Sequence, residues 1–270
     1  MYRFFVAEEN RREEMILITG DDVNHIRNVL RMMPGENVVV SFGKGVDYEC
    51  EICKLGDTEI QLSICREMPV VTELPAEITL FQALPKKDKM ELVIQKAIEL
   101  GAASIVPVKT KRCVVKLDAK KEEKKQFRWQ AIAEAAAKQS GRGIVPQVQP
   151  VHGFSQALQR AEKMDTVLIP YELCDDMAVS VKRMEKAAEK SSIGIFIGPE
   201  GGFERGEIEA AMAMGALPIS LGKRILRTET AGLATLSILM FLIEGKMNGG
   251  RQDGMLSGQC GNDTGLSRSM

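Results

Sequence analysis

The chain has 270 residues, 44% of them hydrophobic, and a formal net charge of −1. This length and composition allow one sizeable hydrophobic core and a second, smaller one, so we expect two globular domains. The longest apolar run, residues 233–243, is shorter than the roughly 20 residues that cross a bilayer, and we expect no membrane span. The N-terminus becomes acidic at Glu8 before a secretory apolar region develops, which favours a cytoplasmic protein.

The six cysteines are scattered along the chain, as expected for reduced thiols rather than a disulfide framework. Cys50 and Cys53 have the spacing of half a zinc site. No second pair completes it, and His25 and His152 stand alone, so we expect no metal.

The charge is unevenly distributed. Residues 71–150 carry 15 Lys and Arg against 9 Asp and Glu, whereas residues 1–70 carry 8 against 13. Because salt limits the reach of each charge to about 8–10 Å, a local basic surface can attract phosphates on a neutral protein. The Lys-Lys-Glu-Glu-Lys-Lys run at 120–125, taken alone, is more typical of a solvated helix face.

The first 72 residues are predicted to form a small β-barrel, because short stretches of alternating or β-branched apolar residues are separated by glycine-containing turns. The clearest strands are residues 36–42, 46–52 and 59–64. Asp21 is expected to cap a short helix that extends to residue 30. Pro69 and Pro75 flank a break, and we place the domain boundary between them.

After the break, strands and helices alternate, which predicts an α/β domain over residues 73–246 with a largely parallel sheet. Ligands in such sheets bind beyond the carboxyl ends of the strands. Strands are expected at residues 78–84, 104–108, 166–169, 193–197 and 217–221. Helices are expected at residues 89–100, 122–140, 177–190, 204–214 and about 230–245. Residues 247–270 are polar and glycine-rich, and we expect a disordered tail.

A glycine-rich loop, Gly198-Pro199-Glu200-Gly201-Gly202, follows the strand at 193–197. Its bare backbone and the N–H groups of the next helix are open to a polar ligand. The loop has neither the spacing of a dinucleotide-binding fingerprint nor that of a Walker loop. On its own it is equally well explained as a tight strand-to-helix turn.

A second loop, Leu221-Gly222-Lys223-Arg224-Ile225-Leu226-Arg227, follows the next strand. Two glycine loops on successive strands place accessible backbone side by side. This arrangement suits a flat purine held by backbone hydrogen bonds and by the side chains of Leu221, Ile225 and Leu226. The helix that follows is apolar on nearly all faces, so it must be buried in a core or against a second subunit.

These motifs resemble the bacterial 16S ribosomal RNA (uracil-N3)-methyltransferase family of the SPOUT superfamily. The resemblance is carried by residues 197–203 and 225–231, together with 3–5, 25–31, 89–101 and 139–142, and it covers about residues 1–246. It implies a PUA-like barrel followed by a SPOUT-type α/β domain with a C-terminal trefoil knot, working as a homodimer. The alternation of strands and helices alone would not predict a knot, because knots are rare.

The resemblance also implies a site for S-adenosyl-L-methionine (SAM) between the two loops and 16S rRNA of the small ribosomal subunit as the substrate. A neighbouring strand end at Ile169 and Pro170 is expected to join this site. The implied cofactor-binding residues are Ile197, Gly198, Pro199, Glu200, Gly201, Gly202, Leu221, Gly222, Ile225 and Leu226.

Uracil N3 is a poor nucleophile until its proton leaves. We predict that Arg227 donates to a uracil carbonyl and stabilises the developing negative charge, while Glu229 or a water accepts the N3 proton. The alternative is structural: Arg227 pairs with Glu229, and Thr228 or Thr230 caps the last helix.

Seven basic residues are candidate RNA contacts, although each alone is also explained as a solvated charge. They are Arg3, Arg27, Arg31, Lys86, Lys89, Arg112 and Arg142. One alternative function is a non-catalytic RNA-binding protein with a knot fold, which SAM affinity would separate from an enzyme. A nucleotide-dependent oxidoreductase is disfavoured because the first βα turn lacks a fingerprint. An enzyme that methylates another RNA position is a further alternative, since N3 rests on the resemblance alone.

Overall fold

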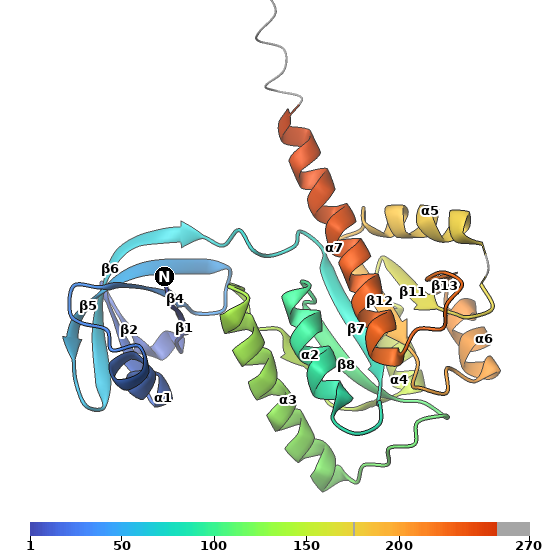
Figure 1. The fold of residues 1–270 in the computed structure, drawn as a ribbon, viewed down its shortest axis with the longest axis horizontal. Coiled ribbons are helices and arrows are strands. Elements are labelled where there is room, and N and C mark those ends of the chain that lie inside the picture. Colours follow the sequence, from blue (N-terminus) through green and yellow to red (C-terminus); the bar gives the residue numbers. More distant parts are fainter. Residues whose placement is uncertain (175, 253–270) are drawn as a thin grey trace, which may run out of the picture.

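The computed structural model describes residues 1–174 and 176–252. Figure 1 shows two separate sheets, a smaller one formed by the N-terminal segment and a larger one that is covered by helices. The last strand of the first sheet ends at Pro69, and the first strand of the second begins at Glu77. The chain therefore passes from one hydrophobic core to another within a short linker.

The N-terminal sheet has six strands in the order β1-β4-β5-β6-β3-β2. Its neighbours are antiparallel except for the parallel pair β1 and β4. Alternate residues such as Val38, Val40 and Leu62 point into its core, as the period of two predicts. The strands are β1 (Arg3–Phe5), β2 (Arg11–Arg12), β3 (Met15–Thr19), β4 (Asn37–Ser41), β5 (Val46–Leu55) and β6 (Glu59–Pro69).

Three short helical turns accompany this sheet, and Val23 and Ile26 from two of them complete its core. They are η1 (Glu8–Asn10), α1 (Asp21–Asn24) and the π-helical η2 (His25–Val29). The predicted helix is thus present, but Asp21 is its first residue and Gly20 occupies the N-cap without a side-chain hydrogen bond. The prediction that Asp21 is the cap is therefore wrong.

The two thiols of the Cys50-x-x-Cys53 motif lie in different surroundings. Cys50 is buried in the N-terminal core, and Cys53 is exposed. Burial raises the pKa of the Cys50 thiol to about 12, so this sulfur stays protonated at neutral pH and is a poor metal ligand. Within residues 1–174 and 176–252, no group of three or more His, Cys, Asp or Glu is placed to hold a metal ion.

The larger sheet has the order β10-β8-β7-β12-β11-β13, with the short β9 pairing β8. Every neighbouring pair is parallel, which confirms the α/β class. The carboxyl ends of β11, β12 and β13 therefore lie together at one edge. The strands are β7 (Glu77–Ala83), β8 (Ser104–Lys109), β9 (Gln147–Val148), β10 (His152–Gly153), β11 (Thr166–Pro170), β12 (Ser192–Ile197) and β13 (Leu217–Ile219).

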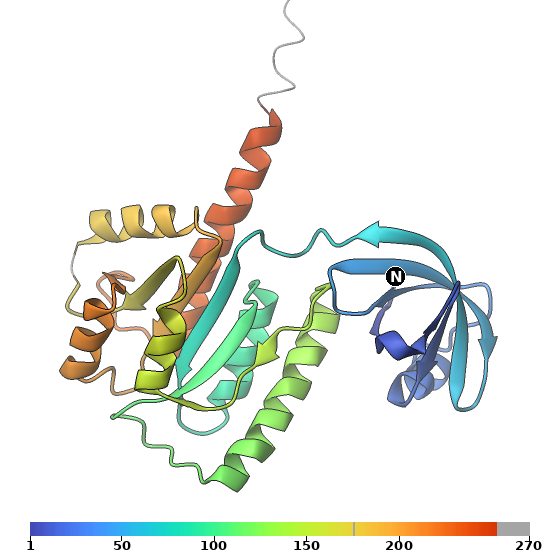
Figure 2. The same ribbon diagram turned by 180° about the vertical axis from the view of Figure 1, so that it is seen from behind.

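Helices cover both faces of this sheet. One face packs against α2 (Lys89–Glu99), α3 (Ala119–Gln139), α5 (Met177–Ala187) and α7 (Thr228–Gln252). The opposite face, seen in Figure 2, packs against α4 (Phe154–Ala161) and α6 (Arg205–Ala213). There the rings of Phe81 and Phe196 stack with centroids 4.4 Å apart. The helix α4 is absent from the predicted elements.

The last helix is longer than expected. α7 runs to Gln252, so residues 247–252 are helical where a disordered tail was predicted, and residues 253–270 lie outside the described residues. By length and composition alone, Thr228–Met247 could cross a membrane. Its stripe of Leu236, Leu239 and Ile243 is instead buried in the core that α2 and α5 share. A core helix passes the same test of length and composition, and we interpret α7 as one.

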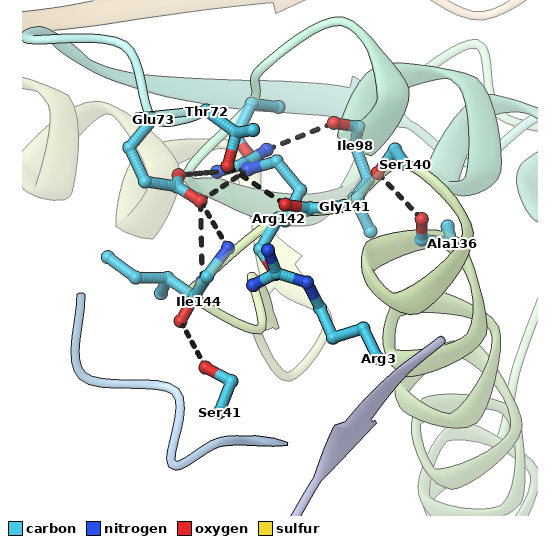
Figure 3. Close-up of polar contacts among 12 residues, drawn as sticks. Arg3, Ser41, Thr72, Glu73, Ile98, Ala136, Ser140, Gly141, Arg142 and Ile144 are labelled. Carbon is cyan, nitrogen blue, oxygen red and sulfur yellow. Dashed lines mark hydrogen bonds and ion pairs between the residues drawn. The ribbon is translucent and has the colours of Figure 1, made fainter. Parts of the chain in front are cut away.

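A buried ion pair joins the linker to the end of α3 (Figure 3). The Arg142 guanidinium donates to the Glu73 carboxylate at 2.5–3.0 Å and to the carbonyls of Ile98 and Ala102 at 3.0 and 3.1 Å. Glu73 also accepts from the backbone N–H groups of Gly143 and Ile144. These bonds fix the point at which the chain enters the second domain.

The N-terminal domain attaches at the same place. Arg3 donates to the Arg142 carbonyl at 3.2 Å, and Ser41 donates to the Gly143 carbonyl at 3.1 Å. Lys138 of α3 pairs with Asp22 at 2.9 Å. A Cβ at Gly143 would lie 2.3 Å from a methyl carbon of Val70, so only glycine lets the linker pass this closely.

We predict that Arg142→Ala lowers the free energy of unfolding by about 3–5 kcal/mol, because it leaves a mostly buried carboxylate and two carbonyls without their donor. Chemical denaturation measures this loss. The matched control is Arg205→Ala, whose pair with Glu209 is largely exposed, so its removal should leave the free energy of unfolding nearly unchanged. Equal losses for the two variants would contradict the structural role of Arg142.

Candidate active site

A cavity of about 440 Å³ lies at the carboxyl ends of β11, β12 and β13, beside the start of α7. This is the edge of a parallel sheet at which ligands are expected to bind. Its size is within the roughly 300–1,000 Å³ range of small-molecule sites. It is lined by Lys89, Pro170, Tyr171, Glu172, Ile197, Gly198, Pro199, Glu200, Gly202, Phe203, Ser220, Leu221, Gly222, Lys223, Arg224, Ile225, Leu226, Arg227, Thr228 and Ala231.

The two glycine loops form most of the wall, as the sequence predicts. Gly222 has a φ of +102° and Gly202 a φ of +67°, values that side-chain-bearing residues rarely adopt. A Cβ at either position would meet nothing within 4 Å, so the glycines are required by the path of the backbone and not by crowding. The loops consequently present bare backbone toward the cavity.

One residue, Thr228, connects the loops to the sheet through hydrogen bonds. The Thr228 hydroxyl donates to the Gly198 carbonyl at 2.6 Å and accepts from the Gln82 side-chain amide at 2.9 Å. Both Gln82 and Thr228 are buried. This one hydroxyl therefore joins three elements: the end of β12, the end of β7 and the first residue of α7. Thr228 does not act as the side-chain cap that the structural alternative assigns to it.

An ammonium group lies between two carboxylates at the cavity. Lys89 Nζ is 3.2 Å from Glu229 Oε2 and 3.4 Å from Glu200 Oε1. Glu200 also accepts from the backbone N–H of Lys86 at 3.0 Å. Partial burial by itself would raise the pKa of Glu200, but this backbone bond, one from its own N–H and the Lys89 ammonium together hold the pKa below its ordinary value.

Arg227 lines the cavity and is exposed. Its carbonyl accepts from the Ala231 backbone N–H at 2.8 Å, so its backbone is fixed by the start of α7. Among the described side chains, no carboxylate lies within 4.0 Å of its guanidinium, and Glu229 pairs with Lys89 instead. The alternative in which Arg227 pairs with Glu229 is therefore wrong, and the guanidinium stays available to a ligand.

Nine of the ten residues that the sequence assigns to the cofactor line the cavity. The exception is Gly201, whose carbonyl accepts from Arg112 at 2.9 Å and whose missing side chain would lie against Arg112. Ile225 lines the cavity but is 91% exposed, so its side chain is free to cover a ligand. Pro170 lines it from the end of β11, while Ile169 is buried in the core.

Sequence reasoning missed several lining residues. Tyr171 and Glu172 follow Pro170, and Ser220 precedes the second loop, so their places after predicted strands could have identified them. Phe203 and Ala231 flank the two loops in the same way. Lys89 was expected to contact RNA, and nothing in its local sequence indicates that it reaches two carboxylates from distant segments.

The predicted RNA contacts separate into three groups. Arg142 is 4% exposed and fully bonded within the protein, and Arg3 pairs with buried Asp47 at 2.6 Å. The prediction that Arg142 contacts RNA is wrong, since its guanidinium is buried and bonded within the protein. Arg3 is only partly buried and stays a predicted RNA contact, although its guanidinium also joins the two domains. Arg27 pairs with Asp57 at 2.6 Å.

The other four lie nearer to solvent or to the cavity. Arg31 and Lys86 are exposed, and Lys89 and Arg112 are engaged at the cavity and its first loop. Together these groups give the site apolar walls, bare backbone and one bridged pair of carboxylates. Two lining guanidinium groups, those of Arg224 and Arg227, have no ion-pair partner among the described side chains. Such a set suits a ligand that has a flat ring and a polar end.

Comparison with known proteins agrees with this geometry. A family profile described as an RNA methyltransferase domain matches residues 72–240, and one described as an RNA methyltransferase PUA domain matches residues 18–65. Ribosomal RNA small subunit methyltransferase E of Bacillus subtilis is 36% identical over 250 residues, which cover 90% of this chain and 98% of the relative.

Two solved structures are similar over nearly the whole chain. Ribosomal RNA small subunit methyltransferase E from Neisseria gonorrhoeae, bound to S-adenosyl methionine, is 34% identical with a TM-score of 0.79, covering 90% of this chain and 98% of that one. A methyltransferase from Legionella pneumophila with bound SAM is 32% identical with a TM-score of 0.77, covering 88% and 96%. The chain therefore belongs to the RNA methyltransferase family of which the ribosomal RNA small subunit methyltransferase E proteins are members.

Proposed function

We propose that this protein is a SAM-dependent methyltransferase that acts on 16S rRNA in the small ribosomal subunit, in the cytoplasm. The observation that carries the proposal is the cavity between two glycine loops, in a chain whose full-length relatives include structures with SAM bound. Incubation with labelled SAM and small subunits that lack the modification, followed by mapping of the methylated nucleotide, tests it. A protein that binds RNA without transferring the label would favour the non-catalytic alternative.

The residues present fit this cofactor. Bare backbone at Gly198 and Gly222 can hold the edge of an adenine, and Leu221 and Leu226 offer apolar side chains to its faces. Glu200, whose pKa lies below its ordinary value, places a negatively charged carboxylate at the cavity, which suits a ligand that carries positive charge. When bound, SAM supplies a methyl group on a sulfonium, which leaves the protein mainly the task of alignment.

We further propose that the acceptor is N3 of a uridine. Arg227 extends into the cavity from a backbone that α7 holds in place, and its guanidinium donates to a uracil carbonyl oxygen as negative charge develops there. Glu229 or a water accepts the N3 proton. Lys89 already occupies one oxygen of Glu229, so water is the stronger candidate.

We predict that Gly222→Ala weakens SAM binding about tenfold or more in isothermal titration calorimetry, because alanine at a φ of +102° costs about 1–3 kcal/mol and shifts the loop. Gly206→Ala is the control. It lies in α6 with open space around its Cβ position and no positive φ, and its SAM affinity should match that of the wild type. Unchanged affinity in Gly222→Ala would remove the second loop from the cofactor site.

We predict that Arg227→Ala reduces methyl transfer by at least about a hundredfold while SAM affinity changes little, because the guanidinium acts on the acceptor and not on the cofactor. Single-turnover transfer of label from SAM to small subunits measures this rate. Arg227→Lys should recover part of it, since the charge is kept and the planar fork is lost. Full activity of the alanine variant would exclude Arg227 from the mechanism.

We also propose that the protein is a homodimer whose α/β domain contains a trefoil knot. Support for the knot comes from the path of the chain: β13 pairs β11 on the side away from β12, and α7 then packs back across β12. Support for the dimer comes from the outer stripe of α7, where Ile238 is 43% exposed and Phe241 is 74% exposed. Val181 of the adjacent α5 adds a further apolar side chain, and a second subunit would bury them.

We predict that Phe241→Glu converts the dimer into a monomer in sedimentation-velocity experiments, because two charges would face each other near a symmetric interface. Lys182→Glu, an equally exposed position of α5 with no apolar side chain to lose, is the control and should leave the dimer intact. A wild-type protein that sediments as a monomer at micromolar concentration would refute the dimer.

A further inference from the structure

Beyond the cavity, one surface of the α/β domain combines free positive charge with an exposed aromatic ring. Phe127 in α3 is 82% exposed, the largest exposed fraction of any described phenylalanine. Residues 109–128, which run through the loop after β8 into α3, carry nine Lys and Arg against three Asp and Glu. This segment accounts for the whole basic excess of the region 71–150.

The charges of this segment are only partly neutralised. Four of the nine cations, Lys109, Lys111, Lys121 and Arg128, each pair with a carboxylate. Lys120 and Lys124 are exposed and have no ion-pair partner among the side chains that the structure describes. These two lysines and Phe127 follow the helical spacing i, i+4, i+7, so they form one stripe, which we call the α3 stripe.

The α3 stripe points away from the protein core. Trp129, Ala133 and Ala137 form the opposite face of α3 and pack in the core with α2. Continuing the stripe by eleven residues from Phe127 reaches Lys138, which pairs with Asp22 of the N-terminal domain. The stripe therefore faces the side of the helix to which that domain attaches, about 16 Å along the helix axis from the junction.

The same segment begins beside the cavity. Arg112 donates to the carbonyl of Gly201 in the first glycine loop at 2.9 Å. From there the chain follows the lower edge of the domain in Figure 1 to the amino end of α3. A basic segment thus connects the cavity to the α3 stripe. An RNA strand that placed one nucleotide in the cavity could follow this segment to the stripe.

We propose that the α3 stripe binds an unpaired segment of the RNA substrate, with Phe127 stacking on a base and Lys120 and Lys124 contacting phosphates. This inference rests on the proposed function and extends it to a second contact surface. An exposed phenylalanine next to unpaired lysines matches single-stranded RNA, because bases stack on aromatic rings while cations contact the phosphates of the RNA backbone. Double-stranded RNA would leave the ring without a stacking partner.

The test measures binding of the full-length protein to unmethylated small subunits and to protein-free 16S rRNA. Phe127→Ala should weaken both about tenfold, and Phe127→Trp should retain wild-type affinity, because stacking needs only an aromatic face. The double variant Lys120→Gln, Lys124→Gln should lower the slope of log affinity against log salt by about 1.4. The control Arg160→Gln, Lys163→Gln removes two exposed charges at α4, on the opposite face of the sheet, and should change neither quantity.

The possible results separate this inference from the proposed function. SAM affinity and thermal stability should be unchanged in the Phe127 variants, since the ring is exposed and far from the loops. Wild-type affinity of Phe127→Ala, with methylation by the wild-type protein intact, would overturn the inference alone. Loss of binding to subunits but not to protein-free rRNA would assign the stripe to a ribosomal protein, and a changed oligomeric state would assign it to a second copy. Either result would overturn the inference about the α3 stripe. A wild-type protein that neither binds nor methylates the RNA would overturn both this inference and the proposed function.

Discussion

The site depends on the buried hydroxyl of Thr228. By donating to Gly198 and accepting from Gln82, it holds the end of β12, the end of β7 and the start of α7 within hydrogen-bond distance of one another. The first glycine loop begins at Gly198, and the second ends where α7 starts. One side chain therefore sets the separation of the two loops. Because Gln82 and Thr228 are buried, losing this hydroxyl would leave a buried amide without this acceptor and would cost more than a surface hydrogen bond.

The charged groups of the site follow from this arrangement. The Lys89 ammonium contacts Glu229 at the start of α7 and Glu200 in the first loop. Both carboxylates are thereby paired with Lys89, and no described carboxylate lies within 4.0 Å of the Arg227 guanidinium. The fold thus separates a fixed charge cluster from a free guanidinium within one cavity. A free cation of this kind can respond to charge that develops on a substrate.

Much of the fold and of the site could be predicted from local sequence, and the features that could not be predicted were missed for physical reasons. The glycine loops were recognisable because a positive φ restricts Gly222 and Gly202 to glycine. The helix α4 was missed although Phe154, Ala157 and Ala161 have helical spacing, because its eight residues are too few for the period to stand out. The carboxylate partners of Lys89 and the Gln82 partner of Thr228 lie more than a hundred residues away in the chain, and no local pattern encodes such contacts. The domain boundary at residue 72, the knot and the dimer stay predictions.

The basic residues show why charge must be interpreted together with burial. Arg3 and Arg142 belong to segments that contribute to the family resemblance, yet their guanidinium groups bind carbonyls and carboxylates at the junction of the domains. Lys120 and Lys124, in a run typical of an ordinary solvated helix face, have no ion-pair partner among the described side chains. A buried arginine stabilises the junction of the domains and does not bind RNA, because its hydrogen bonds are already made within the protein. Affinity for a polyanion depends on the charges that remain free, and these lie beside the exposed ring of Phe127.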